Sequence, residues 1–129
     1  MAAHVKKILV VEDDPVNQQI LSDFLAANGY EMIAAATGSE GIDRFERDVP
    51  DLMLIDVQLP RKNGLELCRE IKSHPQGKGT PVLLMSAVYS DRDQSSRTAH
   101  ASALADGYLT KPFDLVALLA TVRQLLGEA

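Results

Sequence analysis

The chain has 129 residues, of which 46% are hydrophobic, and this is the size and composition of one globular domain. Its 18 acidic and 13 basic residues give a net charge of -5, and the basic residues are scattered, which argues against direct binding of nucleic acid. The single cysteine, Cys68, excludes an internal disulfide, and no apolar run is long enough for a signal peptide or a membrane span, so we expect a cytoplasmic protein with no membrane partner.

Five short apolar runs predict five β-strands, at residues 7–12, 31–36, 51–56, 81–86 and 107–110. Three of these runs are continuously apolar rather than alternating. This pattern is typical of parallel strands that are covered on both faces.

Segments with helical spacing separate the strands. The first follows Asp14, a good N-cap, and Pro15, and it ends at Asn28-Gly29. Its apolar face consists of Val16, Ile20, Leu21, Phe24 and Leu25.

Further helices are predicted at 38–47, 63–73 and 114–126. In the second of these, Asn63 is the expected cap, and Glu66 stands three residues later as in a capping box. Residues 88–104 are Ser-rich and polar before they become Ala-rich, so we expect a loop that leads into a helix from about residue 94 to 104.

This alternation predicts one α/β domain, a doubly wound five-stranded parallel sheet with five flanking helices. Sites in such sheets lie outside the carboxyl ends of the strands, where the strand order reverses. In the flavodoxin-like order 2-1-3-4-5, the strands at 7–12 and 51–56 are neighbours at that point.

The residues at the strand ends carry the chemistry. The strand at 7–12 ends in Glu12 and Asp13, the strand at 51–56 ends in Asp56, Ser86 ends the strand at 81–86, and Lys111 follows the strand at 107–110. Crowded carboxylates repel one another unless a cation joins them, and Mg2+ prefers oxygen ligands. Carboxylates, a metal, a hydroxyl and an ammonium group are equipped for phosphoryl transfer, with one carboxylate as the nucleophile.

Four motifs, "ILVVEDDP", "LMLIDVQLPRKNGLEL", "LLMSA" and "DGYLTKPF", occur here in order and with regular spacing. Together they resemble the receiver domain of two-component response regulators, of the single-domain, chemotaxis-regulator-like kind. The resemblance covers about residues 6–127. It implies a regulatory phosphoacceptor rather than an enzyme, one that assists its own phosphorylation and dephosphorylation.

The resemblance implies that Asp56 accepts a phosphoryl group from a histidine kinase or a histidine phosphotransfer protein, in a two-component system or a phosphorelay. It further implies that Mg2+ or Mn2+ is held by Glu12, Asp13, Asp56 and the backbone carbonyl of Gln58. Ser86 matches the hydroxyl residue that contacts a phosphoryl oxygen.

Lys111 matches the lysine that pairs with another phosphoryl oxygen, and the peptide bond before Pro112 is expected to be cis. Tyr108 matches the aromatic residue that moves inward as Ser86 moves toward the phosphate, which would remodel the face formed by the fourth helix, the fifth strand and the fifth helix. That face would bind an output protein or domain that the sequence does not name. The chain closes at "LLGEA", so we expect either a stand-alone regulator or a receiver excised from a longer chain.

The sequence departs from the family pattern at several positions. Asn63 stands where an acid is common, and Leu104 stands where glycine is frequent. The segment from Ser86 to Tyr108 is a few residues longer than usual. A valine at position 88 cannot orient the water that reaches the phosphoryl group. We therefore expect the aspartyl phosphate to live longer than it would with an acid or an amide at Val88.

Three other functions use some of the same residues. A degenerate receiver would serve only protein contacts. It would not need the complete set of polar residues at the strand ends, which is Glu12, Asp13, Asp56, Ser86 and Lys111. An aspartate-nucleophile phosphatase would want a carboxylate two residues after the nucleophile, where Gln58 stands. A flavin carrier would need a phosphate-binding loop where "EDDPVN" would repel phosphate.

Some of these residues also have plain structural explanations. Asp14 is expected to cap a helix rather than bind metal. Asp56 taken alone could cap a turn, and Tyr108 could be a core-edge residue. Cys68 is expected to pack in the core, and the three histidines lack metal-ligand spacing.

Overall fold

The computed structural model of the chain describes residues 5–87, 104–112 and 114–128. In chain order the elements are β1 (Lys7–Val11), α1 (Pro15–Ala27), β2 (Glu31–Ala35), α2 (Gly38–Asp48), β3 (Leu52–Asp56), α3 (Gly64–Ser73), the 3-10 helix η1 (Gly77–Gly79), β4 (Val82–Ala87), β5 (Gly107–Lys111) and α5 (Leu115–Leu125). The helix expected at 94–104 lies outside the described residues except for its last position, and Val88 lies outside them too.

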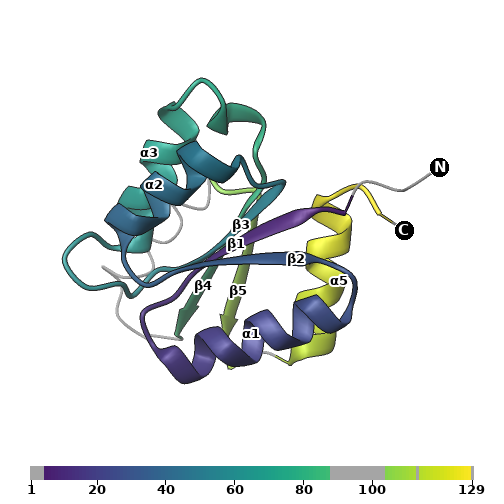
Figure 1. Cartoon of the computed structure of the whole chain (residues 1–129). Coiled ribbons are helices and arrows are strands. Elements are labelled where there is room, and N and C mark those ends of the chain that lie inside the picture. Colours follow the sequence, from purple (N-terminus) through teal and green to yellow (C-terminus); the bar gives the residue numbers. More distant parts are fainter. Residues whose placement is uncertain (1–4, 88–103, 113, 129) are drawn as a thin grey trace.

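The five strands form one parallel sheet in the order β2-β1-β3-β4-β5, which confirms the predicted topology. Helices α1 and α5 cover one face of the sheet, and α2 and α3 cover the other (Figure 1). The strand order reverses between β1 and β3, so the carboxyl ends of these two strands lie at the switch point.

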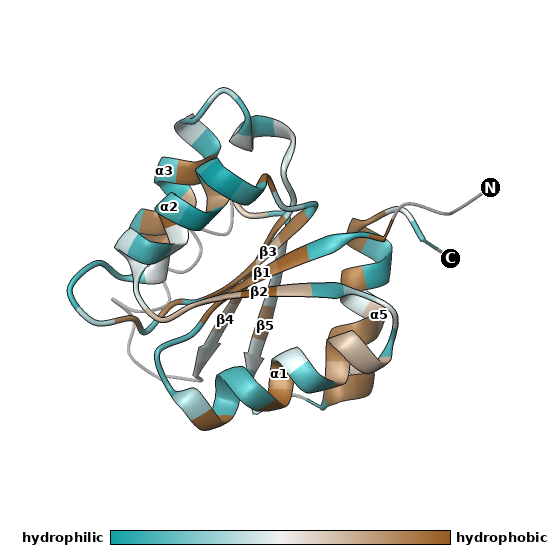
Figure 2. Ribbon diagram, in the orientation of Figure 1, coloured by the Kyte–Doolittle hydropathy of each residue, from teal (hydrophilic) through white to brown (hydrophobic). Residues whose placement is uncertain are grey.

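Strand β1 shows why the central strands are continuously apolar. Its alternate side chains enter two separate cores, because successive residues of a strand point to opposite faces. Leu9 and Val11 pack with α2 and α3, whereas Ile8 and Val10 pack with α1 and α5. The central strands are accordingly hydrophobic over most of their length, while α2 is mostly hydrophilic (Figure 2).

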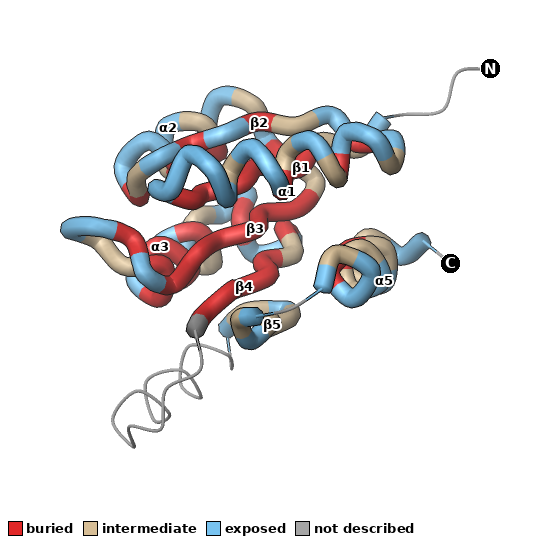
Figure 3. Tube along the Cα trace, turned by 90° about the horizontal axis from the view of Figure 1, so that it is seen from below, coloured by how far each residue is buried: buried red, intermediate tan, exposed pale blue. Residues whose placement is uncertain are grey.

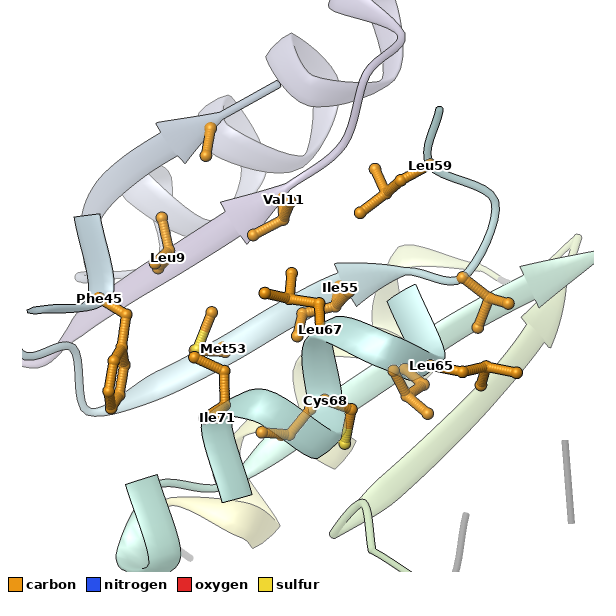
Figure 4. Packing of buried hydrophobic residues seen from close by; sticks show 14 of the residues in the cluster. Leu9, Val11, Phe45, Met53, Ile55, Leu59, Leu65, Leu67, Cys68 and Ile71 are labelled. Carbon is orange, nitrogen blue, oxygen red and sulfur yellow. The ribbon is translucent and has the colours of Figure 1, made fainter. Parts of the chain in front are cut away.

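The core on the α2 and α3 face is built from aliphatic side chains around one aromatic ring. Phe45 of α2 and Leu67, Cys68 and Ile71 of α3 are fully buried against the sheet (Figure 4). Cys68 is therefore a packing residue, as the sequence predicted. Burial in the tube view is concentrated along β1, β3 and β4, while the edge strand β5 is half-exposed (Figure 3).

The helix ends follow the local sequence. Asp14 caps α1 by accepting from the backbone N–H of Asn17 at 3.0 Å, and Asn63 caps α3 by accepting from that of Glu66 at 3.0 Å. Gly29, with φ of +98°, lies just after the C-cap of α1. These caps confirm the predicted boundaries, because each depends on residues only a few positions apart.

The expected apolar face of α1 is only partly correct. Leu21 and Leu25 are buried, but Val16 and Ile20 are 64% and 48% exposed. Residues 21 and 25 are one turn apart and face the sheet, whereas 16 and 20 lie one residue farther round the helix. The buried stripe of α1 is narrower than the apolar stripe in its sequence. Among the described residues, no helix is both long and apolar enough to cross a membrane.

Candidate functional site

The register of the sheet brings the strand ends level with one another. Val11 is paired with Ile55 across β1 and β3, and Asp56 with Met85 across β3 and β4. Across β4 and β5, Ala87 is paired with Lys111. The residues that end or follow β1, β3, β4 and β5 therefore meet at one edge of the sheet, as the sequence predicted.

Asp56 is the centre of this edge. Its side chain is buried, with the residue 3% exposed, and each carboxylate oxygen has a partner. Oδ1 accepts a hydrogen bond from the backbone N–H of Gln58 at 3.0 Å, and Oδ2 accepts one from Nζ of Lys111 at 3.2 Å. A buried carboxylate held in one orientation by two donors is well placed to act as a nucleophile.

Lys111 reaches two acids. Its Nζ lies 3.2 Å from Asp56 Oδ2 and 3.5 Å from Glu12 Oε1. Burial by itself lowers the pKa of Lys111, but the charges of Asp56 and Glu12 outweigh burial, and the pKa is raised above its usual value. The lysine is therefore positively charged at neutral pH. The Lys111–Pro112 peptide bond is cis.

Glu12 is a buried acid whose carboxyl is harder to ionise than usual. It is 1% exposed, and burial, assisted by nearby Asp56, raises the pKa of its carboxyl from 4.5 to about 7, although the backbone N–H of Asp14 and the charge of Lys111 oppose that rise. Its Oε2 accepts from the Asp14 N–H at 3.1 Å, while Oε1 has no hydrogen-bond partner among the described residues. Oε1 is therefore stabilised by the charge of Lys111 at 3.5 Å rather than by a hydrogen bond, and a buried oxygen of this kind can also ligate a metal cation.

The acids are close enough to share such a cation. Glu12, Asp13 and Asp56 each offer a carboxylate oxygen, and these oxygens lie within 4.8 Å of one another. Asp13 is exposed, so the cluster opens to solvent on that side. Three hard oxygen donors this close together fit a hard divalent cation such as Mg2+.

The remaining predicted residues surround this cluster. Ser86 is buried at the end of β4, with 4% exposure. Tyr108 is half-buried in β5 and packs against the core on the α2 and α3 face. The side chain of Gln58 is exposed, and its backbone lies directly beside Asp56.

The loop after β3 folds back onto the peptide of Asp56. The backbone N–H of Gly64 donates to the carbonyl of Val57 at 2.8 Å. A Cβ atom on Gly64 would lie 2.3 Å from the carbonyl oxygen of Asp56, which leaves no space for any side chain. The glycine therefore lets α3 begin directly against the backbone that carries Asp56.

Two polar groups here were missed by the sequence analysis. Gln18 of α1 donates from Nε2 to the backbone carbonyls of Glu12 and Ala35 at 3.2 and 3.1 Å. At the opposite edge of the sheet, Asp106 Oδ2 accepts from the N–H of Val82 at 2.9 Å and from Lys72 Nζ at 2.6 Å. The only local signal for Gln18 is its place one turn into the helix that follows the acidic residues.

Neither Cys68 nor His74 belongs to the site. Burial raises the pKa of the Cys68 thiol to about 11, so it is not a thiolate at neutral pH. His74 lies edge-on to Phe45, with its Nε2 3.4 Å from a carboxylate oxygen of Glu46. His4 and His100 lie outside the described residues.

Comparison with known proteins now identifies the family. The model of the response regulator receiver domain matches residues 8–123. The chain belongs to the response regulator receiver family. Receiver domains are components of two-component signalling.

Three relatives illustrate the similarity. This receiver is 43% identical over 121 residues to the response regulator MprA of Mycobacterium avium, a match that covers 93% of this chain and 50% of MprA. The receiver domain of a signal transduction histidine kinase from Syntrophus aciditrophicus superimposes with a TM-score of 0.89 at 32% identity, covering 95% of this chain and 91% of that one. Response regulator TrrA of Thermotoga maritima, solved in complex with Mg(2+)-BeF, superimposes with a TM-score of 0.82 at 32% identity. The match covers 94% of this chain and 99% of the TrrA chain.

The receiver spans about half the length of the curated relatives that it matches. The similarity therefore establishes the domain family and its fold.

Proposed function

We propose that this receiver is a phosphoacceptor in which Asp56 takes a phosphoryl group from a histidine kinase or a histidine phosphotransfer protein. The observation that carries the proposal is the paired carboxylate of Asp56, buried at the switch point with Nζ of Lys111 3.2 Å from Oδ2. A structural turn cap would not need an ammonium group beside it.

In the transfer, a carboxylate oxygen of Asp56 attacks phosphorus in line with the leaving group. The phosphorus–nitrogen bond of the donor phosphohistidine breaks as the phosphorus–oxygen bond forms, and the electron pair returns to the histidine nitrogen. The product is an acyl phosphate on Asp56. The positive charge of Lys111 balances the negative charge on one phosphoryl oxygen, and the hydroxyl of Ser86 donates to another.

A divalent cation, Mg2+ or Mn2+, would be held by Glu12, Asp13, Asp56 and the backbone carbonyl of Gln58. Bound there, it would neutralise charge on the carboxylates and on the phosphoryl oxygens. Three facts support this ligand set: the closeness of the three carboxylates, the Oε1 of Glu12 that accepts no hydrogen bond from the described residues, and the Mg(2+)-BeF complex of TrrA.

Phosphorylation would act as a switch through Ser86 and Tyr108. Ser86 moves toward the phosphoryl group and leaves space that the ring of Tyr108 occupies, so the surface around β5 changes for an output protein or domain. The half-buried position of Tyr108 against the core supports this role, because a small shift changes how much of the ring is exposed. We place this signalling in the cytoplasm, where a kinase domain would meet the receiver.

The function is tested by intact-protein mass spectrometry after incubation with Mg2+ and acetyl phosphate. We expect a phosphoryl adduct on the wild type and none on Asp56→Asn, whereas Asp43→Asn, at an exposed aspartate of α2, should react like the wild type. If neither acetyl phosphate nor a phosphorylated histidine kinase gave an Asp56-dependent adduct, the degenerate receiver would replace this proposal.

The switch is tested separately by amide NMR spectra with beryllofluoride and Mg2+ as a phosphoryl mimic. We expect the signals of Gly107 to Lys111 to shift in the wild type and to shift much less in Ser86→Ala. Equal shifts in both proteins would remove Ser86 from the switch without affecting the role of Asp56.

A further inference from the structure

The acidic turn between β1 and α1 is tied to the sheet by a side chain from the helix that follows it. Gln18 points its Nε2 at the carbonyl oxygens of Glu12 and Ala35, at 3.2 and 3.1 Å. Both partners are carbonyls, which only accept hydrogen bonds, so the amide nitrogen rather than the amide oxygen must face them. The orientation of Gln18 is therefore fixed by chemistry.

The two carbonyls mark the last connection between β1 and β2. Glu12 N–H donates to the same Ala35 carbonyl at 3.0 Å, one step beyond the last paired residues of the two strands. Gln18 thus joins three elements at the point where the chain leaves β1. The backbone that it holds is that of Glu12, whose carboxylate belongs to the acidic cluster.

The turn itself is closed by short-range hydrogen bonds. The backbone N–H of Asp14 donates to Glu12 Oε2 at 3.1 Å, and Gln18 N–H donates to the carbonyl of Asp14 at 2.9 Å. Gln18 therefore contacts this turn through both its backbone and its side chain. Its side chain is half-buried, so solvent competes only in part for the two carbonyls.

Such a tie matters because the cluster repels itself. The single positive charge of Lys111, beside Asp56 and Glu12, does not balance three carboxylates whose oxygens lie within 4.8 Å, so without a metal ion their repulsion favours a more open turn. A turn that opens must close again before it can bind metal, and this closure reduces the apparent affinity. Fixing the backbone in advance removes that cost, in the way that hydrogen bonds to ligating residues do at metal sites.

We propose that Gln18 is a positioning residue that holds the turn of Glu12 and Asp13 in the geometry that binds the divalent cation. This inference rests on the proposed function, since it concerns the same metal site. It assigns to α1 a role in preparing the site in addition to covering the sheet.

The test compares two neighbouring glutamines. Gln18→Met keeps the length and the helix propensity of the side chain but removes the donor. Gln19→Met is the matched control, because among the described residues the Gln19 side chain bonds within α1, from Nε2 to Asp23 Oδ1 at 2.7 Å on the exposed surface. Mg2+ binding is measured by isothermal titration calorimetry, well below the lowest melting temperature of the three proteins. Amide NMR signals of residues 12–14 are recorded without metal.

We expect Gln18→Met to weaken Mg2+ binding about tenfold, the lower end of what loss of an outer-shell partner costs. The metal-free signals of residues 12–14 should broaden or shift in this variant, and Gln19→Met should match the wild type in both measurements. Wild-type affinity in Gln18→Met, even with a lowered melting temperature, would reduce Gln18 to a structural role and overturn the inference. If instead the wild type itself bound no Mg2+, the proposed function would fail, and this inference with it.

Discussion

Replacing Glu12 with glutamine removes a buried negative charge while keeping the shape of the side chain. The pKa of Glu12 is raised from 4.5 to about 7, chiefly by burial, so ionisation of this carboxyl opposes folding. A difference of that size corresponds to about 3 kcal/mol between the folded and unfolded states. This is a large part of the total stability of a domain, which is of the order of 5–15 kcal/mol.

The sign fixes the pH dependence. Below pH 4.5 the carboxyl is protonated in both states and the penalty is absent. As the pH rises from 4.5 through about 7, the unfolded chain releases its proton first, and the metal-free wild type loses stability until Glu12 is ionised in both states. Glutamine does not titrate, so Glu12→Gln escapes this loss.

We therefore expect metal-free Glu12→Gln to exceed the wild type in unfolding free energy by no more than about 1 kcal/mol at about pH 5 and by about 3 kcal/mol at about pH 8.5. Urea denaturation in EDTA across this range measures the difference. Glu31→Gln, at an exposed glutamate of β2, is the control and should show no such trend.

Magnesium should reverse the order. The wild type gains stability by binding the ion, while the variant has lost one ligand and gains less. A stability difference that is flat from about pH 5 to about pH 8.5 would refute the reasoning, because it would mean that Glu12 ionises as easily in the fold as in water.

Three further changes test the packing around the site by urea denaturation. Val49 is the C-cap of α2 and has φ of 44°, a left-handed conformation that is costly for a β-branched residue. Val49→Gly should therefore raise the free energy of unfolding by about 1 kcal/mol, and a decrease would contradict the strain. Gly64→Ala should lower the free energy of unfolding by about 2 kcal/mol or more, because its Cβ would meet the Asp56 carbonyl. Gly79→Ala, whose Cβ would lie in open space, should change it by no more than about 0.5 kcal/mol. Equal effects of the two changes would count against the close approach at Gly64. Asp106→Ala should cost about 2 kcal/mol by removing the acceptor of the Val82 N–H, and an unchanged protein would show that water replaces it.

The sequence was most informative where structure depends on neighbours in the chain. Asp14 and Asn63 were predicted as caps because a cap needs only a side-chain oxygen and an N–H three residues later. The strands were recognised from continuous apolar runs, which only parallel strands covered on both faces require. Their order then predicted that Asp13 and Asp56, on neighbouring strands, would converge on one pocket, and their carboxylate oxygens lie within 4.8 Å of each other.

It was less informative where one side chain has several equivalent places to go. Val16 and Ile20 are as apolar as Leu21, yet they face solvent, because only a narrow stripe of α1 packs against the sheet. Gln18 looks like any polar helix residue until the end of β2 is brought beneath it. Asp106 and Lys72 likewise become partners only when α3 and β5 are placed beside β4.

The sequence by itself therefore determined the elements, the parallel sheet and the set of residues at its carboxyl edge. These features follow from the apolar runs and from the residues that directly follow each run in the chain. Tertiary structure alone decided how those residues are held. Burial raised the pKa of Glu12, Lys111 came within 3.2 Å of Asp56, and Gln18 closed the turn beside them. Desolvation and side-chain hydrogen bonds depend on which segments pack together, and this is settled only when the whole chain has folded.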